Sequence, residues 1–250
     1  MVLGLFLVVL LLCGCSTLER DNVYDPYGKN YGSEAKSSSS SGDQPSSSSA
    51  DASSSSGSSS SGTQSSSNSI TLIDSRDGKS YRTVVIGTQT WMAENLNYAV
   101  VGSKCGNDSD LFDVNTTTCN TYGRLYDWEI AVTGICPEGW RLPSYEEWEM
   151  LITYVENQGL CTACAGTRLK AASGWNSGNG TDNHGFVALP GGSGDTNGLF
   201  TAVRIAGYWW SATPSSTTNA LYLAMSHELS YVYIGNGAKR ILLSVRCVMG

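Results

Sequence analysis

The chain has 250 residues, of which 15 are basic and 22 acidic, so that its formal net charge at neutral pH is −7. No stripe of Lys and Arg stands out, which argues against nucleic acid as a partner, because a phosphate backbone is bound through clustered positive charge. The length suits one domain of ordinary size together with flanking segments.

Residues 2–12 form an apolar run with the length of a signal-peptide h-region, short of the roughly 20 residues that span a bilayer. The run ends in LCGC, which resembles a bacterial lipobox and predicts a lipoprotein signal peptide over residues 1–14. Cys15 is then lipidated and becomes the mature N-terminus, and two lipid chains would anchor it stably. Ser16 resembles the residue at this position in lipoproteins sorted to the outer membrane, so we expect a lipid-anchored protein at the cell surface. An ordinary secretory signal, cut elsewhere, is the alternative.

The next two segments are predicted to carry no packed core. Residues 15–36 form a short mature N-terminal segment without periodicity. Residues 37–69 contain 21 serines in 33 positions, and a stretch without apolar groups cannot offset the entropy of ordering. We expect a disordered linker with a typical span on the order of 30 Å, which would hold the following domain, residues 70–250, away from a membrane surface.

This domain contains six cysteines, and an even number in an exported chain predicts disulfides. Six cysteines allow 15 pairings, so the sequence leaves the connectivity open. The pairs that we expect are Cys105–Cys119, Cys136–Cys247 and Cys161–Cys164. For the last pair, a redox couple and half of a zinc site are the alternatives, although no second pair at short spacing completes a zinc site.

One helix has clear signals at its beginning and end. Ser144 followed by Glu147 forms a capping box. Apolar residues then recur at helical spacing, at Trp148, Leu151, Ile152 and Val155. We expect a helix over residues 145–158, followed by Gly159 as its C-terminal glycine. Arg141 precedes the helix and is expected to brace the fold as a hydrogen-bond donor rather than to act in catalysis.

Strand signals lie on both sides of this helix. Residues 81–86 and 89–92 predict a hairpin across Gly87 and Thr88. Residues 229–234 predict a strand, with Asn236 and Gly237 as the turn before another strand over residues 240–248. The Gly- and Asn-rich residues 175–201 predict a long loop, and such loops inside compact domains are usually functional or mobile.

The string CPEGWRLPSYEEWEML at residues 136–151 is similar to the middle of the Fibrobacter succinogenes major paralogous domain. Other blocks resemble the same family in the same order, at residues 77–98, 122–131, 165–192, 207–213 and 244–248. More distantly, RLPSYEEWEML and the terminal SVRCV resemble a pattern shared by formylglycine-generating sulfatase-modifying domains and C-type lectin-like folds. The resemblance implies a compact, disulfide-braced α+β domain of the C-type lectin-like kind, with one or two helices, short antiparallel strands and long loops. It also implies that Tyr208, Trp209 and Trp210 form a buried strand.

The resemblance offers a test for catalysis, because formylglycine-generating enzymes use a cysteine pair late in the domain. Residues 207–247 contain only Cys247, which is expected in a disulfide, so that activity does not carry over. His184 and His227 lie in polar, turn-like surroundings typical of solvated histidines. We therefore expect no enzymatic activity. A carboxylate pair for glycosidic cleavage and an oxidoreductase-like relic are the alternatives.

The sequence also contains candidate residues for ligand binding, although they form no recognised motif. Tyr231 and Tyr233, with Tyr222 on the preceding strand, are candidates for a platform on which sugar rings stack, because aromatic rings are rigid and amphipathic. Trp175 and His184 are further candidate ligand-binding residues. The alternative for the tyrosines is that they cover a small sheet.

Calcium is a candidate cofactor, although no cofactor is firmly indicated. Oxygen ligands are abundant on the predicted loop, at Asn176, Asn179, Asp182, Asn183 and Asp195. The alternative is that Asn and Asp serve local turns. The sequence thus favours a membrane-anchored surface lipoprotein that presents a non-enzymatic binding or adhesion domain to an extracellular glycan or plant polymer. The alternative is an envelope structural protein that contacts other surface proteins.

Overall fold

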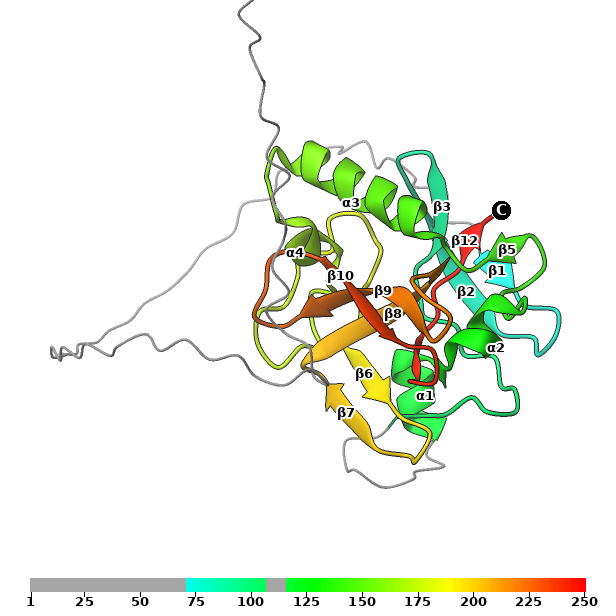
Figure 1. Ribbon diagram of the computed structural model, residues 1–250. Coiled ribbons are helices and arrows are strands. Elements are labelled where there is room, and N and C mark those ends of the chain that lie inside the picture. The colour runs from blue at the N-terminus through cyan, green and yellow to red at the C-terminus, as the bar shows by residue number, and fades with distance from the viewer. Residues whose placement is uncertain (1–70, 107–115) are drawn as a thin grey trace, which may run out of the picture. The chain divides into compact units, whose positions relative to one another are not determined.

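The computed structural model describes residues 71–106 and 116–250 (Figure 1). The signal peptide, the lipidated Cys15, the segment over residues 15–36 and the linker over residues 37–69 lie outside the described residues and stay predictions. Among the residues that are described, no helix is both long and apolar enough to cross a membrane.

The described helices all lie before residue 170, and the described elements after them are all strands. The helices are α1 (Thr116–Tyr122), α2 (Trp128–Val132), α3 (Tyr145–Gly159) and α4 (Ala165–Leu169). The strands are β1 (Thr71–Ile73), β2 (Ser80–Ile86), β3 (Gln89–Met92), β4 (Leu125–Tyr126), β5 (Trp140–Arg141), β6 (Gly191–Gly194), β7 (Phe200–Val203), β8 (Ala206–Pro214), β9 (Asn219–Ser226), β10 (Tyr233–Ala238), β11 (Leu243–Ser244) and β12 (Val248–Met249). The mixed α+β class is confirmed. The described residues contain four helices where one or two were expected, because three of them have only five to seven residues and no periodic apolar stripe.

The described strands form two sheets that the C-terminal segment connects. One sheet has the order β1-β2-β3-β12-β5, and the other has the order β10-β9-β8-β11-β4, with β6 pairing β8 and β7. In Figure 1, β8, β9 and β10 cross the middle of the domain below α3, and β12 lies beside β3. Because β11 belongs to one sheet and β12 to the other, residues 245–247 cross from sheet to sheet.

Both sheets bury side chains on two faces. Along β8, Tyr208 and Trp210 belong to one hydrophobic cluster, and Trp209 belongs to another on the opposite face. Trp91 and Met92 of β3 divide in the same way. The strand alternation therefore explains why adjacent aromatic residues are all buried, and the prediction of a buried strand over Tyr208 to Trp210 is confirmed.

Helix α3 has the predicted beginning and a different end. Ser144 and Glu147 form the capping box, and the Glu147 carboxylate also accepts two hydrogen bonds from Arg141, which thus braces the fold. Gly159 is the last helical residue, and Leu160 after it takes the left-handed conformation, with φ 47°. A Cβ on Gly159 would lie 2.6 Å from Cys161 Sγ. The glycine is therefore required for this close approach and not for a left-handed turn.

Three disulfides join the predicted pairs of cysteines: Cys105–Cys119, Cys136–Cys247 and Cys161–Cys164. The second disulfide joins Cys136, which precedes β5, to Cys247 in the segment between β11 and β12, over a sequence separation of 111. Both of its cysteines are buried.

The hairpin of β2 and β3 is confirmed, since Ile86 pairs with Gln89 across two residues. The strand predicted over residues 229–234 is wrong in position: β10 begins at Tyr233 and contains Asn236 and Gly237, and the chain turns at residues 239–240. Glycine is used inside β10 because the Tyr222 ring lies against it, only 2.3 Å from a Cβ placed on Gly235.

Two other predictions need correction. The strand expected over residues 240–248 is divided into β11 and β12, because residues 245–247 leave one sheet for the other. The loop expected over residues 175–201 contains β6 and the start of β7, and it buries Phe186 and Ala188. Polar composition hid this strand because all four residues of β6 are glycine or serine, and each is buried.

Candidate functional site

A groove of about 520 Å³ opens where α2 meets the ends of β9 and β10. We call it the polar groove, and it is lined by Asp127, Glu129, Thr217, Thr218, Asn219, Ala238, Lys239 and Arg240. These residues come from the first turn of α2, the β8–β9 turn and the turn after β10. Three separate parts of the chain thus supply polar side chains to one surface.

Hydrogen bonds between these parts fix the groove. Asp127 Oδ1 accepts a hydrogen bond of 2.8 Å from Ile130 N and so caps α2. Trp128 N donates to Lys239 O at 2.9 Å, and Lys239 N donates to Thr218 O at 2.9 Å. The Trp128 indole donates to Ser211 O, which fastens α2 to β8. The groove therefore has a rigid frame.

Lys239 extends across this frame. Its Nζ lies 4.2 Å from the centre of the Trp128 ring and donates to Thr217 O at 3.1 Å. A cation over an indole face is attracted by the ring quadrupole, which holds the lysine in place. An aromatic ring with a positioned cation is consequently part of the groove's wall.

The charges in the polar groove are balanced and unpaired. Two carboxylates, Asp127 and Glu129, face two cations, Lys239 and Arg240. Among the ion pairs that the described residues form, none involves these four side chains. A surface of this kind offers hydrogen-bonding groups of both types without a strong field of one sign.

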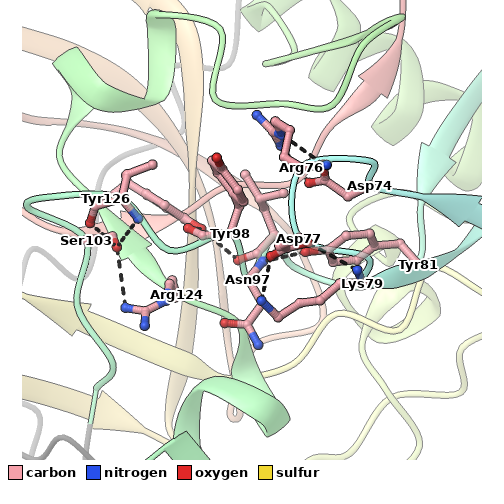
Figure 2. A network of polar contacts seen from close by, with 12 residues as sticks. Asp74, Arg76, Asp77, Lys79, Tyr81, Asn97, Tyr98, Ser103, Arg124 and Tyr126 are labelled. Carbon is pink, nitrogen blue, oxygen red and sulfur yellow. Dashed lines mark hydrogen bonds and ion pairs between the residues drawn. The ribbon is translucent and has the colours of Figure 1, made fainter.

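A second groove, of about 420 Å³, lies between the β1–β2 turn, residues 94–97 and α1. Its charged side chains already have partners, since Lys79 pairs with Asp77 at 2.6 Å and Glu94 pairs with Arg82 at 2.5 Å. Figure 2 shows the Asp77–Lys79 pair beside Tyr81 and Asn97. Its charges serve local structure, so the polar groove is the better candidate for a ligand.

Buried hydroxyls lie beside the second groove (Figure 2). Tyr81 Oη accepts a hydrogen bond from Asn97 N at 3.0 Å, and burial raises the pKa of Tyr81 to about 12. Tyr126 Oη donates to Tyr98 O at 2.8 Å, and burial raises the pKa of Tyr126 as well. Both phenols stay neutral at physiological pH and act as hydrogen-bonding anchors of residues 96–98.

Beneath the second groove, Asn95 and Arg246 form a buried polar centre. Asn95 Oδ1 accepts from Arg246 Nε at 3.1 Å, from Arg246 Nη2 at 2.6 Å and from Trp209 Nε1 at 2.8 Å. The guanidinium also donates to the carbonyls of Phe186 and Val187 and stacks on the Phe186 ring at 4.4 Å. Burial lowers the pKa of Arg246 to about 9. The guanidinium is thus a buried charge held by neutral oxygens.

The comparison with protein-family models identifies a single long match. The model of the Fibrobacter succinogenes major domain matches residues 84–249. The chain belongs to this family. No curated protein and no solved structure matches the chain. The match starts inside β2 and ends in β12. The major domain therefore includes the Asn95–Arg246 centre, the polar groove and both sheets except β1 and the first half of β2.

Of the three tyrosines in the predicted aromatic platform, Tyr222 lies in the core of this major domain. Tyr222 is buried, with an exposed fraction of 5%, and its Oη lies 3.2 Å from that of Tyr233. Tyr233 is half-buried at the start of β10, whereas Tyr231 lies outside the strand. Trp175 is also buried, and its indole donates to Ala188 O. Tyr222 and Trp175 are enclosed in the core and offer no face on which a sugar could stack, whereas Tyr231 and Tyr233 are half-buried.

His184 lies near α3. Its ring centre is 6.1 Å from that of Tyr154. Burial, followed by the positive charge of Arg168, lowers the pKa of His184.

The candidate calcium ligands serve the backbone. Asp195 caps the β6–β7 turn by accepting from Asn197 N and Leu199 N, which lowers its pKa. Asp182 accepts from Val187 N, and burial raises its pKa. Asn179 Oδ1 accepts from Trp175 N.

Their positions also separate them. Asn176 N donates to Arg204 O at the base of the β6–β7 hairpin, while Asp195 lies at its tip. Asn183 Oδ1 accepts from the Thr181 hydroxyl. Within residues 71–106 and 116–250, no group of three or more His, Cys, Asp and Glu side chains is placed to hold a metal ion.

His227 makes a contact that the sequence did not suggest. Ser177 Oγ lies 2.6 Å from His227 Nδ1, and Glu228 Oε1 lies 3.8 Å from Nε2. A catalytic imidazole is oriented by a buried carboxylate within hydrogen-bonding distance, whereas the Glu228 side chain is 75% exposed and too distant. The three residues are better described as a surface contact.

Proposed function

We propose that this protein is a non-enzymatic binding protein, anchored in the outer membrane through Cys15, whose domain binds an extracellular glycan in the polar groove. The proposal includes a C-type lectin-like fold for the domain, supported by the two sheets and by the disulfide that ties Cys136 to the segment before the last strand. The predicted serine linker would let the domain reach a polymer beyond the membrane surface.

The observation that carries this proposal is the set of four charged side chains in the polar groove, which form no ion pair among the described residues. Asp127 and Lys239 already make hydrogen bonds within the protein. By contrast, the exposed Glu129 and Arg240 can accept from and donate to ligand hydroxyls. Hydrogen bonds to charged groups are roughly twice as strong as those between neutral groups. Sugar hydroxyls need both donors and acceptors, and the groove provides both.

The charge balance of the groove narrows the class of ligand. Two acids and two bases give no net field that would attract a phosphate or a polycation. A neutral polymer of hydroxyl groups suits such a surface, and an open groove accommodates a chain rather than a small enclosed molecule. We therefore favour a neutral polysaccharide, with cellulose and related plant polymers as the first probes.

The test uses the full-length lipidated protein in detergent on a glycan array and in a cellulose pull-down. We expect retention on at least one neutral glycan. The double substitution Glu129→Gln/Arg240→Gln should weaken glycan binding at least tenfold, since each lost hydrogen bond to a charged group is worth about 1.5–3 kcal/mol. Both residues are exposed, and the double change leaves the net charge unchanged.

A matched control is available at the opposite end of β8 and β9. Glu228→Gln with Arg204→Gln removes the same two charges from exposed residues outside the groove. This variant should bind like the wild type. Absence of retention on every polymer, or equal loss in both variants, would contradict the proposal. Crosslinking on intact cells that recovers a protein neighbour instead of polysaccharide would favour the envelope structural protein.

A further inference from the structure

The Cys161–Cys164 disulfide differs from the other two in its place and in its ring size. Its cysteines are separated by 3 in the sequence, against 14 and 111 for the other pairs. Both of its cysteines are half-exposed, whereas Cys119, Cys136 and Cys247 are buried. A short ring constrains the unfolded chain least, and an exposed disulfide is accessible to an attacking thiolate.

The backbone around this pair is strained. Leu160 and Ala163 have left-handed conformations, with φ of 47° and 59°, although neither is glycine. L-residues rarely adopt this region, and such strain tends to gather at functional sites. Ala163 lies inside the closed ring, so opening the disulfide would relax it.

A positive charge lies beside Cys161. A Cβ placed on Gly159 would lie 2.6 Å from Cys161 Sγ and 3.1 Å from Arg168 Nε. Because both atoms are close to the same position, the sulfur and the guanidinium are neighbours. Arg168 Nε is buried and has no hydrogen-bond partner among the described residues. Arg168 also forms no ion pair there. A thiolate at Cys161 would supply the acceptor that this buried donor lacks.

We propose that Cys161–Cys164 is a thiol-exchange site. An external dithiol opens this disulfide in the folded domain while the other two disulfides stay closed. Cys161 leaves as a thiolate, and the positive charge of Arg168 stabilises it. This site is separate from the polar groove and does not depend on the glycan proposal.

The exchange proceeds in two balanced steps. One thiolate of the external dithiol attacks Cys164 Sγ, the Cys161–Cys164 bond breaks, and its electron pair leaves with Cys161 as a thiolate. The second thiol of the external molecule, once deprotonated, attacks its own sulfur in the mixed disulfide and releases the Cys164 thiolate, which takes a proton from solvent. The domain gains two electrons as a dithiol, and the external dithiol is oxidised to a disulfide.

The opening is expected to be local, because α4 has other anchors. Thr167 N donates to Ser230 O at 2.8 Å, and the Ser230 hydroxyl donates to Ala163 O at 3.0 Å. Asn183 N donates to Arg168 O at 3.0 Å. The reduced domain, and a Cys161→Ser/Cys164→Ser variant, should therefore keep the native fold.

The test titrates the full-length protein with dithiothreitol, followed by alkylation and peptide mass mapping. We expect Cys161 and Cys164 to be labelled first, while the other four domain cysteines stay unlabelled. The Cys161→Ser/Cys164→Ser variant should lose this first step only. Simultaneous opening of all three disulfides, or earlier opening of Cys105–Cys119, would overturn the proposal.

The role of Arg168 has its own measurement. Arg168→Gln should slow the opening by dithiothreitol at least threefold at constant pH, whereas Arg204→Gln, the same change at an exposed site, should leave the rate unchanged. Arg168→Lys keeps the positive charge and should retain most of the rate, which covers the case in which Arg168→Gln does not fold. An unchanged rate in a folded Arg168→Gln, or a rate in Arg168→Lys as low as that of a neutral variant, would overturn the assignment.

Discussion

The Asn95–Arg246 centre and the polar groove are both built from polar side chains, yet they use them in opposite ways. The centre is buried, and its guanidinium donates to three different acceptor residues. The groove is open, and the charged side chains of Glu129 and Arg240 form no ion pair among the described residues. Buried polar groups must be satisfied within the protein, whereas exposed ones remain available to a ligand.

This contrast separates architecture from function within one domain. Residues 245–247 connect the two sheets. Arg246 holds this connection through its hydrogen bonds to Asn95, and Cys247 holds it through the disulfide to Cys136. The groove lies at the far ends of β9 and β10 and depends on turns. Changes at the connection should therefore alter stability, and changes in the groove should alter binding alone.

The largest effect is expected from opening the buried disulfide at the connection. Cys136→Ala with Cys247→Ala should lower the free energy of unfolding by about 4–5 kcal/mol, because a ring of this length constrains the unfolded chain most. Cys161→Ser with Cys164→Ser should cost about 2 kcal/mol in the same chain-entropy model. Denaturant unfolding of both variants measures the difference. Equal losses would show that ring length does not govern these disulfides.

The next largest effect is expected at Asn95. Asn95→Ala removes one oxygen that accepts three hydrogen bonds and leaves the Arg246 charge without its main partner. Breaking a buried charged network by removing one partner typically costs about 3–5 kcal/mol. Denaturant unfolding provides the measurement, with the exposed Asn197→Ala as a matched control. A loss below that of the control would contradict the role given to the centre.

Periodic and capping signals allowed part of this fold to be predicted from the sequence. The capping box at Ser144 and the apolar spacing of α3 depend on contacts within a few residues, and both are confirmed. The β2–β3 hairpin is equally local, as its strands are joined by two residues. The family resemblance is confirmed as well.

The rest depends on contacts between distant residues. Asn236 and Gly237 suggested a turn, but they lie inside β10. The Tyr222 ring there occupies the space that a side chain on Gly235 or Gly237 would need. Arg246 resembles an ordinary strand residue until Asn95, 151 residues away in the sequence, is placed against it. The residues of the polar groove gave no motif, since α2 and the turns on either side of β9 and β10 meet only in the folded domain.

Acid should weaken the β1–β2 turn in a predictable direction. Hydrogen bonds that Arg76 donates to the Asp74 carboxylate, above all those from the guanidinium, lower the pKa of Asp74 from its ordinary value of 3.8. The ionised pair therefore stabilises the fold fully above this ordinary value, and the contribution is lost as pH falls through the lowered folded-state pKa. Asp74→Asn should cost about 2 kcal/mol at pH 7.

The pH dependence distinguishes this pair from other carboxylates. Unfolding free energies of the wild type, Asp74→Asn and Arg76→Gln are compared between pH 7 and pH 3. Both variants should lose less stability on acidification than the wild type does, because the depressed pKa no longer exists in either. A wild-type-like acid dependence in Arg76→Gln would show that Arg76 is not the cause of the shift.

The smallest effect on stability is expected in the polar groove, where the effect on binding is greatest. Glu129→Gln with Arg240→Gln should change the free energy of unfolding by less than about 0.5 kcal/mol, as is usual for exposed residues without partners. Retention on the glycan should fall in the same variant. A stability loss comparable to that of Asn95→Ala would place Glu129 and Arg240 in the architecture, and the distinction between the two regions would then fail.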